Sequence, residues 1–294
     1  MLSFLKLIRR KLYMAIARPI AKRLPYSDRG DRWFYWHHFF TQHDRWPGKR
    51  MLFNDVLYRI KSGPEIVSPL RLKTTDKELA KEFIAERAGA KYNVPTIAVL
   101  RNKEDIDKFD FPEDCVIKPT HGCGGVTILQ GGAQPDRAAL AEQLTSNYYY
   151  AARERNYRDL TGKLIVEPLL FQGHDVHDFK VFCWKGKARC ILYVNDRNVA
   201  FYRQLYDTNW SLLPIELSPY GIDKPNVDRP LVLQEMLEVA EKLSAPFDFV
   251  RIDFYIDGKT LLVGEITHCH WGANDRFLSL DDEKALSRLV FDET

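Results

Sequence analysis

Two β-hairpins in the last third of the chain constrain its fold more than any other feature of the sequence. Each has two strand-like runs joined by a short turn that contains glycine. The strands are expected at residues 178–184 and 188–195, joined by Lys185 and Gly186, and at residues 249–256 and 261–267, joined by Asp257 and Gly258. Antiparallel hairpins interleaved with helices point away from a doubly wound parallel sheet. The fold class that follows is α+β, organised in lobes.

Helices and short strands alternate in the rest of the chain. The stretch from Thr75 to Glu78 has the spacing of a capping box and predicts a helix that Gly89 ends. Strands are expected at residues 95–100, 115–118, 126–129 and 164–170, and one long helix is expected from Pro135 to Tyr150. The length of 294 residues suits about two domains, or one domain with two lobes.

The first 27 residues have a charge pattern of their own. They contain seven Lys or Arg residues and no acidic one, so the net charge of +3 conceals a tail of +7 on a body of −4. Apolar residues recur at helical spacing as one stripe, made by Leu5, Ile8, Leu12, Ala15 and Ile16. Such a helix can lie on an anionic membrane, or it can pack its stripe against the body. The acidic body argues against nucleic acid as a partner.

Cysteine use and hydropathy indicate the compartment. The five cysteines contain no Cys-x-x-Cys pair, which is typical of reduced thiols in a cytoplasmic protein. The sequence lacks the roughly 18 consecutive apolar residues of a membrane-spanning helix. Arg9, Arg10 and Lys11 interrupt any signal-peptide core. We therefore expect a cytoplasmic protein, peripheral at the inner face of the cell membrane if the tail binds lipid.

A glycine-rich loop separates two of the expected strands. It runs from Lys118 through His121 to Gly122, Gly124 and Gly125. Glycines let backbone N–H groups approach phosphate oxygens, and Lys118 places a positive charge at the base of the loop. The loop is not a Walker A motif, because no Gly-Lys-Ser or Gly-Lys-Thr follows. On this pattern alone, a phosphate-binding loop and a tight hairpin both remain open.

Two carboxylates occupy opposite arms of the second hairpin. Asp253 and Glu265 lie among apolar residues, where unpaired carboxylates are costly, and two oxygen ligands suit Mg²⁺. The alternative is a solvated pair of charges on an exposed sheet face. Because their separation is even, a regular two-residue turn would place them on opposite faces. The magnesium hypothesis therefore requires a three-residue turn or a bulge, which also brings Arg251 and Thr267 to the same face.

Two further segments carry candidate binding groups. Residues 166–169 could read an adenine edge through their backbone, although a buried strand that ends at Pro168 is the simpler explanation. His268 and His270 follow the second hairpin, and their spacing could serve a shared zinc ion. No remote pair of ligands completes such a site, so we expect a histidine that faces the substrate instead.

Together and in this order, these segments resemble the ATP-grasp superfamily, and within it the TupA-like branch, named for teichuronopeptide biosynthesis. The resemblance runs from about Leu52 to Phe277 and rests on an ordered set of short motifs. They are Leu52-Phe-Asn-Asp-Val-Leu, Thr75-Asp-Lys-Glu, Val116-Ile-Lys-Pro-Thr-His-Gly-Cys-Gly-Gly, Val166-Glu-Pro-Leu, Asp178-Phe-Lys-Val-Phe-Cys-Trp-Lys-Gly-Lys, Asn195-Asp-Arg, Phe249-Val-Arg-Ile-Asp-Phe-Tyr and Val263-Gly-Glu-Ile-Thr.

The resemblance implies an ATP-grasp-like fold in which two α+β lobes clasp ATP. A reduced N-terminal region and the basic amphipathic helix would precede the lobes. The divisions would be a tail at residues 1–27, an N-terminal helical and αβ region at 28–110, a small lobe with the glycine loop at 111–170, and a large lobe with the metal site at 171–294.

The resemblance also implies roles for single residues. ATP would be bound by Lys77, Lys118, His121, Gly122, Gly124, Gly125, Glu167, Pro168, Leu169 and Asp178, or less favourably Asp175 in place of Asp178; Mg²⁺ by Asp253, Glu265 and Thr267; and the catalytic residues would be Arg251, Lys180 and Arg197. Thr267 departs from the family pattern, which often has Asn at this position. A hydroxyl group can still bind magnesium, so the departure weakens only a second metal site.

The implied reaction joins a carboxylate to an amine through an acyl phosphate, at the expense of ATP. Its substrate would be a cell-envelope polysaccharide or its precursor, for example a uronic acid that receives an amino acid. The partners would be a small-molecule or glycan carboxylate, an amine, and an anionic membrane surface through residues 1–27. Two other functions remain open, namely a kinase of a sugar or lipid head group and a non-catalytic nucleotide-binding scaffold at the membrane.

Overall fold

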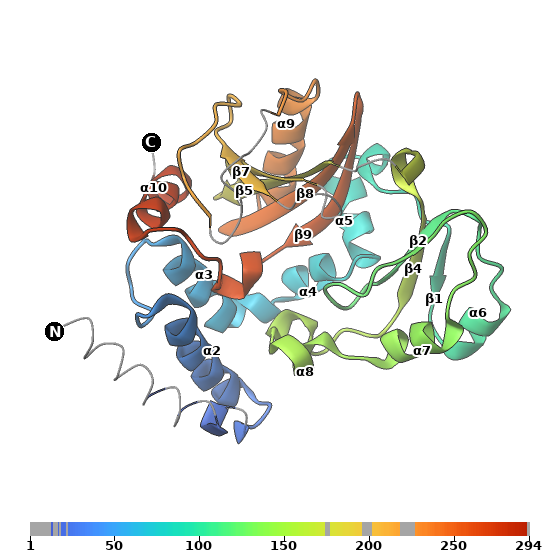
Figure 1. Ribbon diagram of the computed structural model, residues 1–294, viewed down its shortest axis with the longest axis horizontal. Helices are drawn as coiled ribbons and strands as arrows, with labels where there is room; N and C mark the ends of the chain where they lie inside the picture. Colours follow the sequence, from blue (N-terminus) through green and yellow to red (C-terminus); the bar gives the residue numbers. More distant parts are fainter. Residues whose placement is uncertain are drawn as a thin grey trace.

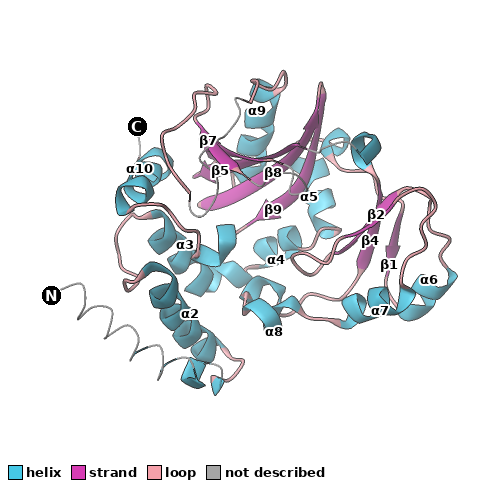
Figure 2. Cartoon of the chain, viewed as in Figure 1, coloured by secondary structure: helices cyan, strands magenta, loops and turns pink. Residues whose placement is uncertain are grey.

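Two antiparallel sheets organise the chain, a smaller one on the right of Figure 1 and a larger one at its top. The computed structural model describes residues 13, 17, 19–21, 23–173, 177–195, 202–217 and 227–292. Helices interleave with the strands of both sheets (Figure 2). The predicted α+β class is confirmed.

The smaller sheet has the strand order β1-β4-β2-β3. Its strands are β1 (Ala98–Leu100), β2 (Cys115–Pro119), β3 (Thr127–Leu129) and β4 (Leu164–Pro168). Helices α6 (Lys103–Lys108) and α7 (Arg137–Thr145) pack on this sheet, and Ile106, Ile117 and Leu140 share its buried core. The glycine loop is the connection between β2 and β3, as expected.

The larger sheet has the strand order β7-β6-β5-β8-β9. Its strands are β5 (His177–Trp184), β6 (Lys187–Val194), β7 (Arg203–Tyr206), β8 (Phe249–Asp257) and β9 (Thr260–Thr267). Helix α9 (Leu233–Ser244) covers one face, where Met236 shares a core with Ile252. Helices α3 (Phe53–Ser62) and α10 (Leu280–Phe291) cover part of the other face, where Phe53 and Phe249 pack together.

A β-bulge interrupts the pairing of β8 with β9. Asp257 pairs with Thr260, so the turn contains two residues and not the three that one of our two alternatives required. Further along, Asp253 pairs with Glu265, and the register shift leaves Gly264 as the extra residue. The structure thus adopts the bulge, which was the other alternative.

The bulge changes which residues of β9 face the cleft. Val263 and Ile266 both belong to the core under α9, although they are three positions apart. Without the extra residue, strand alternation would turn Glu265 toward that core. With it, Glu265 and Thr267 lie on the same face as Asp253.

The remaining helices and short helical turns lie outside the two sheets. They are α2 (Asp28–His43), α4 (Pro69–Thr75), α5 (Leu79–Arg87), α8 (Tyr148–Ala152) and the short turns η1 (Pro64–Val67), η2 (Ala90–Tyr92), η3 (Arg155–Tyr157), η4 (Leu170–Gly173) and η5 (His270–Ala273). The expected capping box at Thr75 is wrong, because Asp76 Oδ1 accepts the N–H groups of Glu78 and Leu79 instead. The long helix expected up to Tyr150 is two helices, because Asn147 caps α8.

The apolar stripe expected in the tail lies outside the described residues. Tyr13, which is described, has its hydroxyl 2.9 Å from His37 Nδ1 on α2. Its ring packs against Phe40 and Trp46, with centroids 4.7 and 5.5 Å away. No helix in the described part of the chain is both long enough and apolar enough to cross a bilayer.

Candidate active site

Charged and polar side chains gather on one face of the larger sheet, on three adjacent strands. They are Asp178 and Lys180 on β5, Arg251 and Asp253 on β8, and Glu265 and Thr267 on β9. The intervening residues Phe179, Ile252 and Ile266 point into the core under α9. Strand alternation therefore holds the polar set on the opposite face of a rigid sheet.

Arg251 and Asp253 form a bidentate ion pair at the centre of this set. Nε donates to Oδ1 at 2.6 Å and Nη2 donates to Oδ2 at 2.7 Å. Lys180 Nζ donates to the same Oδ2 at 2.8 Å. Burial works to raise the pKa of Asp253, but Arg251 and Lys180 together lower it. Asp253 is therefore not the unpaired carboxylate that our sequence argument assumed, since both cations come from positions next to it in the sheet.

Glu265 faces Asp253 across the β8–β9 ladder and differs from it in one respect. Its carboxylate has no hydrogen-bond or ion-pair partner among the residues that the structure describes. No three His, Cys, Asp or Glu side chains gather as a ready-made metal site within the described ranges. A magnesium ion here would take Glu265 and Asp253 from the protein and fill its shell with phosphate oxygens and water, which is how Mg²⁺ is usually bound beside nucleotides. The donor set fits that group.

Arg251 is also held from behind by a chain of buried groups. Its Nη1 lies 2.5 Å from His270 Nδ1, and His270 Nε2 lies 2.9 Å from Asp275 Oδ2. Asp275 in turn accepts from Arg203 Nη1 at 3.0 Å. Burial lowers the pKa of His270 to about 4, so the neutral ring accepts from Arg251 and donates to Asp275. The expectation of a substrate-facing histidine is wrong for His270, which is fully buried.

His268 is likewise buried and has partners of its own. Its Nδ1 lies 2.9 Å from Arg71 Nη1, and its Nε2 lies 2.8 Å from Thr74 Oγ1. Burial, with the Arg71 charge, holds its pKa well below the usual value. Both histidines therefore act as neutral hydrogen-bonding groups that join β9 and the segment after it to other elements.

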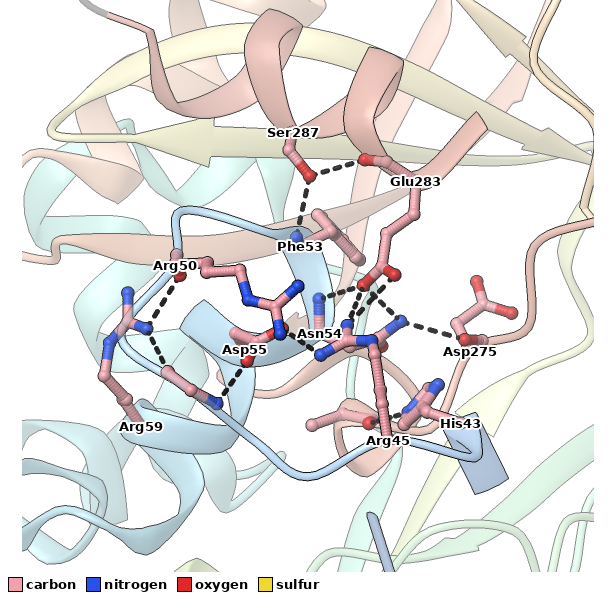
Figure 3. A network of polar contacts seen from close by, with 12 residues as sticks. His43, Arg45, Arg50, Phe53, Asn54, Asp55, Arg59, Asp275, Glu283 and Ser287 are labelled. Atoms are coloured by element: carbon pink, nitrogen blue, oxygen red, sulfur yellow. Dashed lines mark hydrogen bonds and ion pairs between the residues drawn. The ribbon is translucent and has the colours of Figure 1, made fainter. Parts of the chain in front are cut away.

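A second polar network fixes the backbone beside Asp275 (Figure 3). Asn54 Nδ2 donates to the Asp275 carbonyl at 3.0 Å and to Glu283 Oε1 at 3.1 Å. Glu283 also accepts from Arg45 Nη2 at 2.9 Å. Arg45 also forms an ion pair with Asp55. One set of charged side chains therefore joins α3, α10 and the loop after α2. The network anchors the end of the chain of groups that holds Arg251.

On the opposite side of the cleft, two lysines share one carboxylate. Lys118 Nζ donates to Glu167 Oε2 at 2.9 Å, and Lys81 Nζ donates to Oε1 at 2.6 Å. Burial works to raise the pKa of Glu167, but the two lysines lower it. Burial also works to lower the pKa of Lys118, but Tyr255, Glu167 and Glu265 raise it. Lys118 and Glu167 are thus charged near neutral pH, whereas burial lowers the pKa of Lys81.

One pocket brings this lysine pair together with β9. It is lined by Lys77, Lys81, Lys118 and Glu167 and, from the other sheet, by Gly264 and Glu265. Lys118 Nζ also lies 5.4 Å from the centroid of the Tyr255 ring on β8. Three lysines therefore face a carboxylate of the larger sheet across a cleft, an arrangement suited to a polyanion with a bound divalent cation.

The glycine loop is tied down at two points. Lys77 Nζ donates to the Gly122 carbonyl at 2.6 Å. His121 uses both ring nitrogens, because Nδ1 accepts from the Lys163 N–H at 3.2 Å and Nε2 lies 3.0 Å from the Ser146 carbonyl. Between these anchors, Gly124 and Gly125 have φ values of +80° and +67°, which residues with side chains rarely adopt. The loop therefore has an exposed tip whose backbone conformation suits glycine, on a base held by side-chain hydrogen bonds.

The remaining nucleotide candidates lie at the end of β4 and the start of β5. The Glu167 side chain is occupied by the two lysines, so a hinge contact here would use the backbone of Glu167, Pro168 and Leu169. Asp178 Oδ1 is buried without a hydrogen-bond partner in the described part of the chain, which suits an acceptor for a ribose hydroxyl. Asp175 and Arg197 lie outside the described residues.

Sequence reasoning missed several groups of the site. Lys81 follows Lys77 by four positions, the spacing of neighbours on one helix face, so its presence beside Lys77 was open to prediction. Arg203 and Asp275 carried no comparable signal, since their meeting with His270 depends on long-range contacts. Lys180 on β5 was expected to assist catalysis, but its ion pair with Asp253 was not predicted.

Solved structures with a similar fold include several ligases. The D-alanine–D-alanine ligase of Bacillus anthracis shares 16% identity over 67% of this chain and 59% of its own, with a TM-score of 0.40. The L-amino acid ligase of Bacillus licheniformis shares 13% identity over 80% of this chain and 54% of its own, with a TM-score of 0.44. The ATP-grasp ligase PsnB, in complex with a minimal precursor, shares 14% identity over 69% and 54%, with a TM-score of 0.40.

The match to these structures therefore spans between half and two thirds of each of them. No curated protein matches the sequence. Residues 61–288, more than three quarters of the chain, match the family described as TupA-like ATPgrasp. Because this match covers well over half of the chain, the chain belongs to the TupA-like ATP-grasp family.

Proposed function

We propose that this protein is an ATP- and Mg²⁺-dependent ligase that joins a carboxylate to an amine through an acyl phosphate. The observation that carries the proposal is the pocket in which Lys77, Lys81 and Lys118 face Glu265 across the cleft. The family supports ligase chemistry with ATP, and the similar solved structures are named as ligases. The substrate would be a cell-envelope polysaccharide or its precursor, such as a uronic acid that receives an amino acid.

The proposed chemistry follows from the weakness of carboxylates as electrophiles. The substrate carboxylate oxygen attacks the γ-phosphorus of ATP, the bond to the β,γ-bridging oxygen breaks, and ADP leaves. The amine nitrogen then attacks the carbonyl carbon of the acyl phosphate, loses a proton and expels inorganic phosphate, which leaves an amide. Mg²⁺ held by Asp253 and Glu265, with Thr267 beside them, would stabilise the charge on the phosphate oxygens.

The other site residues would assist this reaction by charge and by position. Arg251, oriented by Asp253 and His270, would stabilise the transferring phosphoryl group, and Lys180 and Arg197 would assist it. Lys77 and Lys118 would bind phosphates under the loop formed by His121, Gly122, Gly124 and Gly125; Glu167, Pro168 and Leu169 would contact the adenine; and Asp178, or Asp175, would accept from the ribose. Closure of the loop would keep water from the acyl phosphate.

Release of ADP tests the proposal most directly. The purified full chain is mixed with ATP and Mg²⁺ and with panels of uronic acids and amino acids. We expect ADP only when a carboxylate and an amine are both present, with an amide product of the matching mass. A stable phosphorylated product formed without an amine would replace the ligase with a kinase. If the chain binds nucleotide but never releases ADP, the result would favour the non-catalytic scaffold.

The tail gives the proposal a location. We infer that residues 1–27 bind an anionic membrane surface from the cytoplasmic side, with about 1 kcal/mol contributed by each basic residue near the surface. The seven basic residues and the absence of acidic ones support this inference. Co-sedimentation with vesicles that contain phosphatidylglycerol should decrease at least tenfold when residues 1–27 are deleted. Vesicles of phosphatidylcholine alone serve as the control, and equal binding of both chains to anionic vesicles would contradict the anchor.

A further inference from the structure

Helix α2 has a solvent-facing side that the proposed chemistry does not use. Arg29, Arg32, Trp33 and Trp36 are all exposed there. Because the last three follow Arg29 by three, four and seven positions, all four side chains lie on one side of the helix. Trp33 is 63% exposed, although tryptophan is ordinarily among the more buried residues. This side of α2 therefore combines large apolar rings with positive charge.

The opposite side of α2 fixes the helix against the rest of the molecule. Phe39 is buried and packs against Tyr58 of α3, with ring centroids 5.4 Å apart. Asp31 accepts from the Tyr149 hydroxyl at 2.7 Å and from Arg153 Nη1 at 3.1 Å. The helix lies at the lower left of Figure 1, away from the smaller sheet. Its exposed side is thus a fixed surface of the folded body.

Aromatic rings extend the exposed side of α2 into a continuous surface. Trp33 meets Trp36 edge to face with centroids 5.9 Å apart, and Trp36 stacks on Trp46 at 3.6 Å. The Phe40 ring lies 4.2 Å from that of Trp46. We call Trp33, Trp36, Phe40 and Trp46 the tryptophan patch. Tyr13 of the tail packs against two of its rings, so the patch is continuous with the tail.

The charges of α2 make this surface attractive to anions. Neither Arg29 nor Arg32 has a hydrogen-bond or ion-pair partner among the residues that the structure describes. Both acidic residues of the helix are occupied by arginines from elsewhere in the chain. Asp28 accepts from Arg158 Nη1 at 2.7 Å, and Asp31 is buried in the contacts given above. An anionic partner would therefore meet two free guanidinium groups and no unpaired carboxylate of α2.

An anionic bilayer fits this combination better than a protein surface does. Tryptophan rings lie preferentially at the level of the lipid head groups, and arginine side chains there reach the phosphates. A second copy of the chain would place its own arginines opposite Arg29 and Arg32, where like charges repel. The adjoining tail adds seven basic residues and no acidic one. Charge and aromatic character thus both favour a lipid surface.

We propose that the tryptophan patch, with Arg29 and Arg32, binds an anionic lipid bilayer, with the rings of Trp33 and Trp36 at the level of the head groups. The inference rests on the proposed membrane location, which it extends from the tail to the folded body, and it does not depend on the ligase chemistry. Two linked contacts bind more tightly than either alone. The second contact, on a fixed helix, also sets the orientation of the body on the membrane.

Partitioning of full-length variants onto vesicles tests the patch. With vesicles of phosphatidylcholine and phosphatidylglycerol, Trp33→Ala should lower the partition coefficient about tenfold, because one large apolar ring leaves the interface. Trp33→Ala combined with Trp36→Ala should lower it about 100-fold. Arg32→Gln should lower it about fivefold at low salt, and this effect alone should disappear at high salt. Leu231→Ala removes a side chain that is 78% exposed just before α9, and as the matched control it should bind like the wild type.

Fluorescence quenching shows whether the patch itself touches lipid. Lipids with bromine near the head group should quench part of the tryptophan fluorescence of the bound wild-type chain. The double variant should lose this quenching at lipid concentrations that bind it fully. Trp33→Ala, which removes only one edge contact, should unfold at the wild-type temperature and so excludes misfolding as the cause.

The outcomes separate the patch from the tail. Wild-type partitioning of the double variant, or a bound wild-type chain whose fluorescence is not quenched, would overturn the patch and leave the tail as the membrane contact. A wild-type chain that binds no anionic vesicle would overturn both the membrane location and this inference, and a protein partner would then be the occupant to seek. Neither result would alter the test of ligase activity by ADP release.

Discussion

Glu265→Gln is expected to reduce the rate of ADP release by about 10³-fold, which corresponds to the several kcal/mol that a bound metal supplies to a phosphoryl transfer. Glu265 has no partner among the described side chains, so its neutral isostere leaves no buried donor or acceptor unpaired. We therefore expect the free energy of unfolding to change by less than about 1 kcal/mol. The change removes a negative ligand without disturbing the sheet that carries it.

Two measurements check this expectation. The rate of ADP release is followed against Mg²⁺ concentration, and the variant should require far more Mg²⁺ for half-maximal rate. Calorimetric titration with ADP, with and without Mg²⁺, gives a readout that does not depend on turnover, and only the wild type should gain affinity from the metal. Glu238→Gln, an exposed position on α9, is the matched control. A wild-type rate and Mg²⁺ dependence in Glu265→Gln would refute the metal assignment.

Asp253→Asn provides an informative contrast with Glu265→Gln. Asp253 compensates the buried charges of Arg251 and Lys180, so its neutralisation leaves Arg251 without its carboxylate partner and leaves Lys180 with Asp178 alone. Removal of one partner from a buried pair destabilises a protein by about 3–5 kcal/mol. Asp253→Asn should therefore lose stability as well as activity, whereas Glu265→Gln loses activity alone. Urea unfolding of the two variants would distinguish these roles.

Gly264→Ala is expected to have the next largest effect, because Gly264 is the extra residue of the bulge. A Cβ at this position would lie 2.6 Å from Tyr255 Cε2, closer than any ordinary contact. Overpacking of this kind costs about 1–3 kcal/mol of unfolding free energy. If the ring or the strand moves by about 1 Å, the displacement of Glu265 should reduce activity by about 10²-fold. Thermal unfolding and ADP release measure the two effects.

A double variant identifies the cause of that effect. Tyr255→Leu removes the ring that an alanine at position 264 would meet. If the clash is the cause, the stability loss of the double variant should be smaller than the sum of the two single losses. Gly258→Ala is the contrasting variant, because Gly258, unlike Gly264, has a positive φ of +56° and has no atom within 4 Å of a Cβ, so it introduces backbone strain without a clash. Wild-type stability and activity in Gly264→Ala would show that the bulge tolerates a side chain.

The amino-acid sequence predicted most of the elements and the order in which the site residues occur. Strand periodicity predicted both hairpins, and the glycine run between two strands predicted the loop after Lys118. These features depend on neighbours in the chain, so local patterns reveal them. The parity argument even restricted the second hairpin to a three-residue turn or a bulge. It could not choose between them, because the packing of Gly264 against Tyr255 is a cross-strand contact.

Single helix boundaries were less accessible to prediction. Asp76 Oδ1, not the Thr75 hydroxyl, accepts the N–H groups of Glu78 and Leu79 at the start of the helix that carries Lys81. The Thr75 hydroxyl instead donates to the Arg71 carbonyl at 2.7 Å. The helix expected up to Tyr150 is divided by the Asn147 cap. In each case a short polar side chain accepts backbone N–H groups and starts a new helix, which the helical periodicity of the sequence did not reveal.

The sequence by itself determined the chemistry available to this protein: lysines before and within a glycine loop, two carboxylates on one hairpin, and an arginine two residues from one of them. Only the tertiary structure decided how that chemistry is arranged. It gave Asp253 its cationic partners, turned His270 from a substrate-facing group into a buried support for Arg251, and left Glu265 without a partner among the described residues. The physical reason is that burial and ion pairing depend on residues far apart in the chain, which no local pattern records.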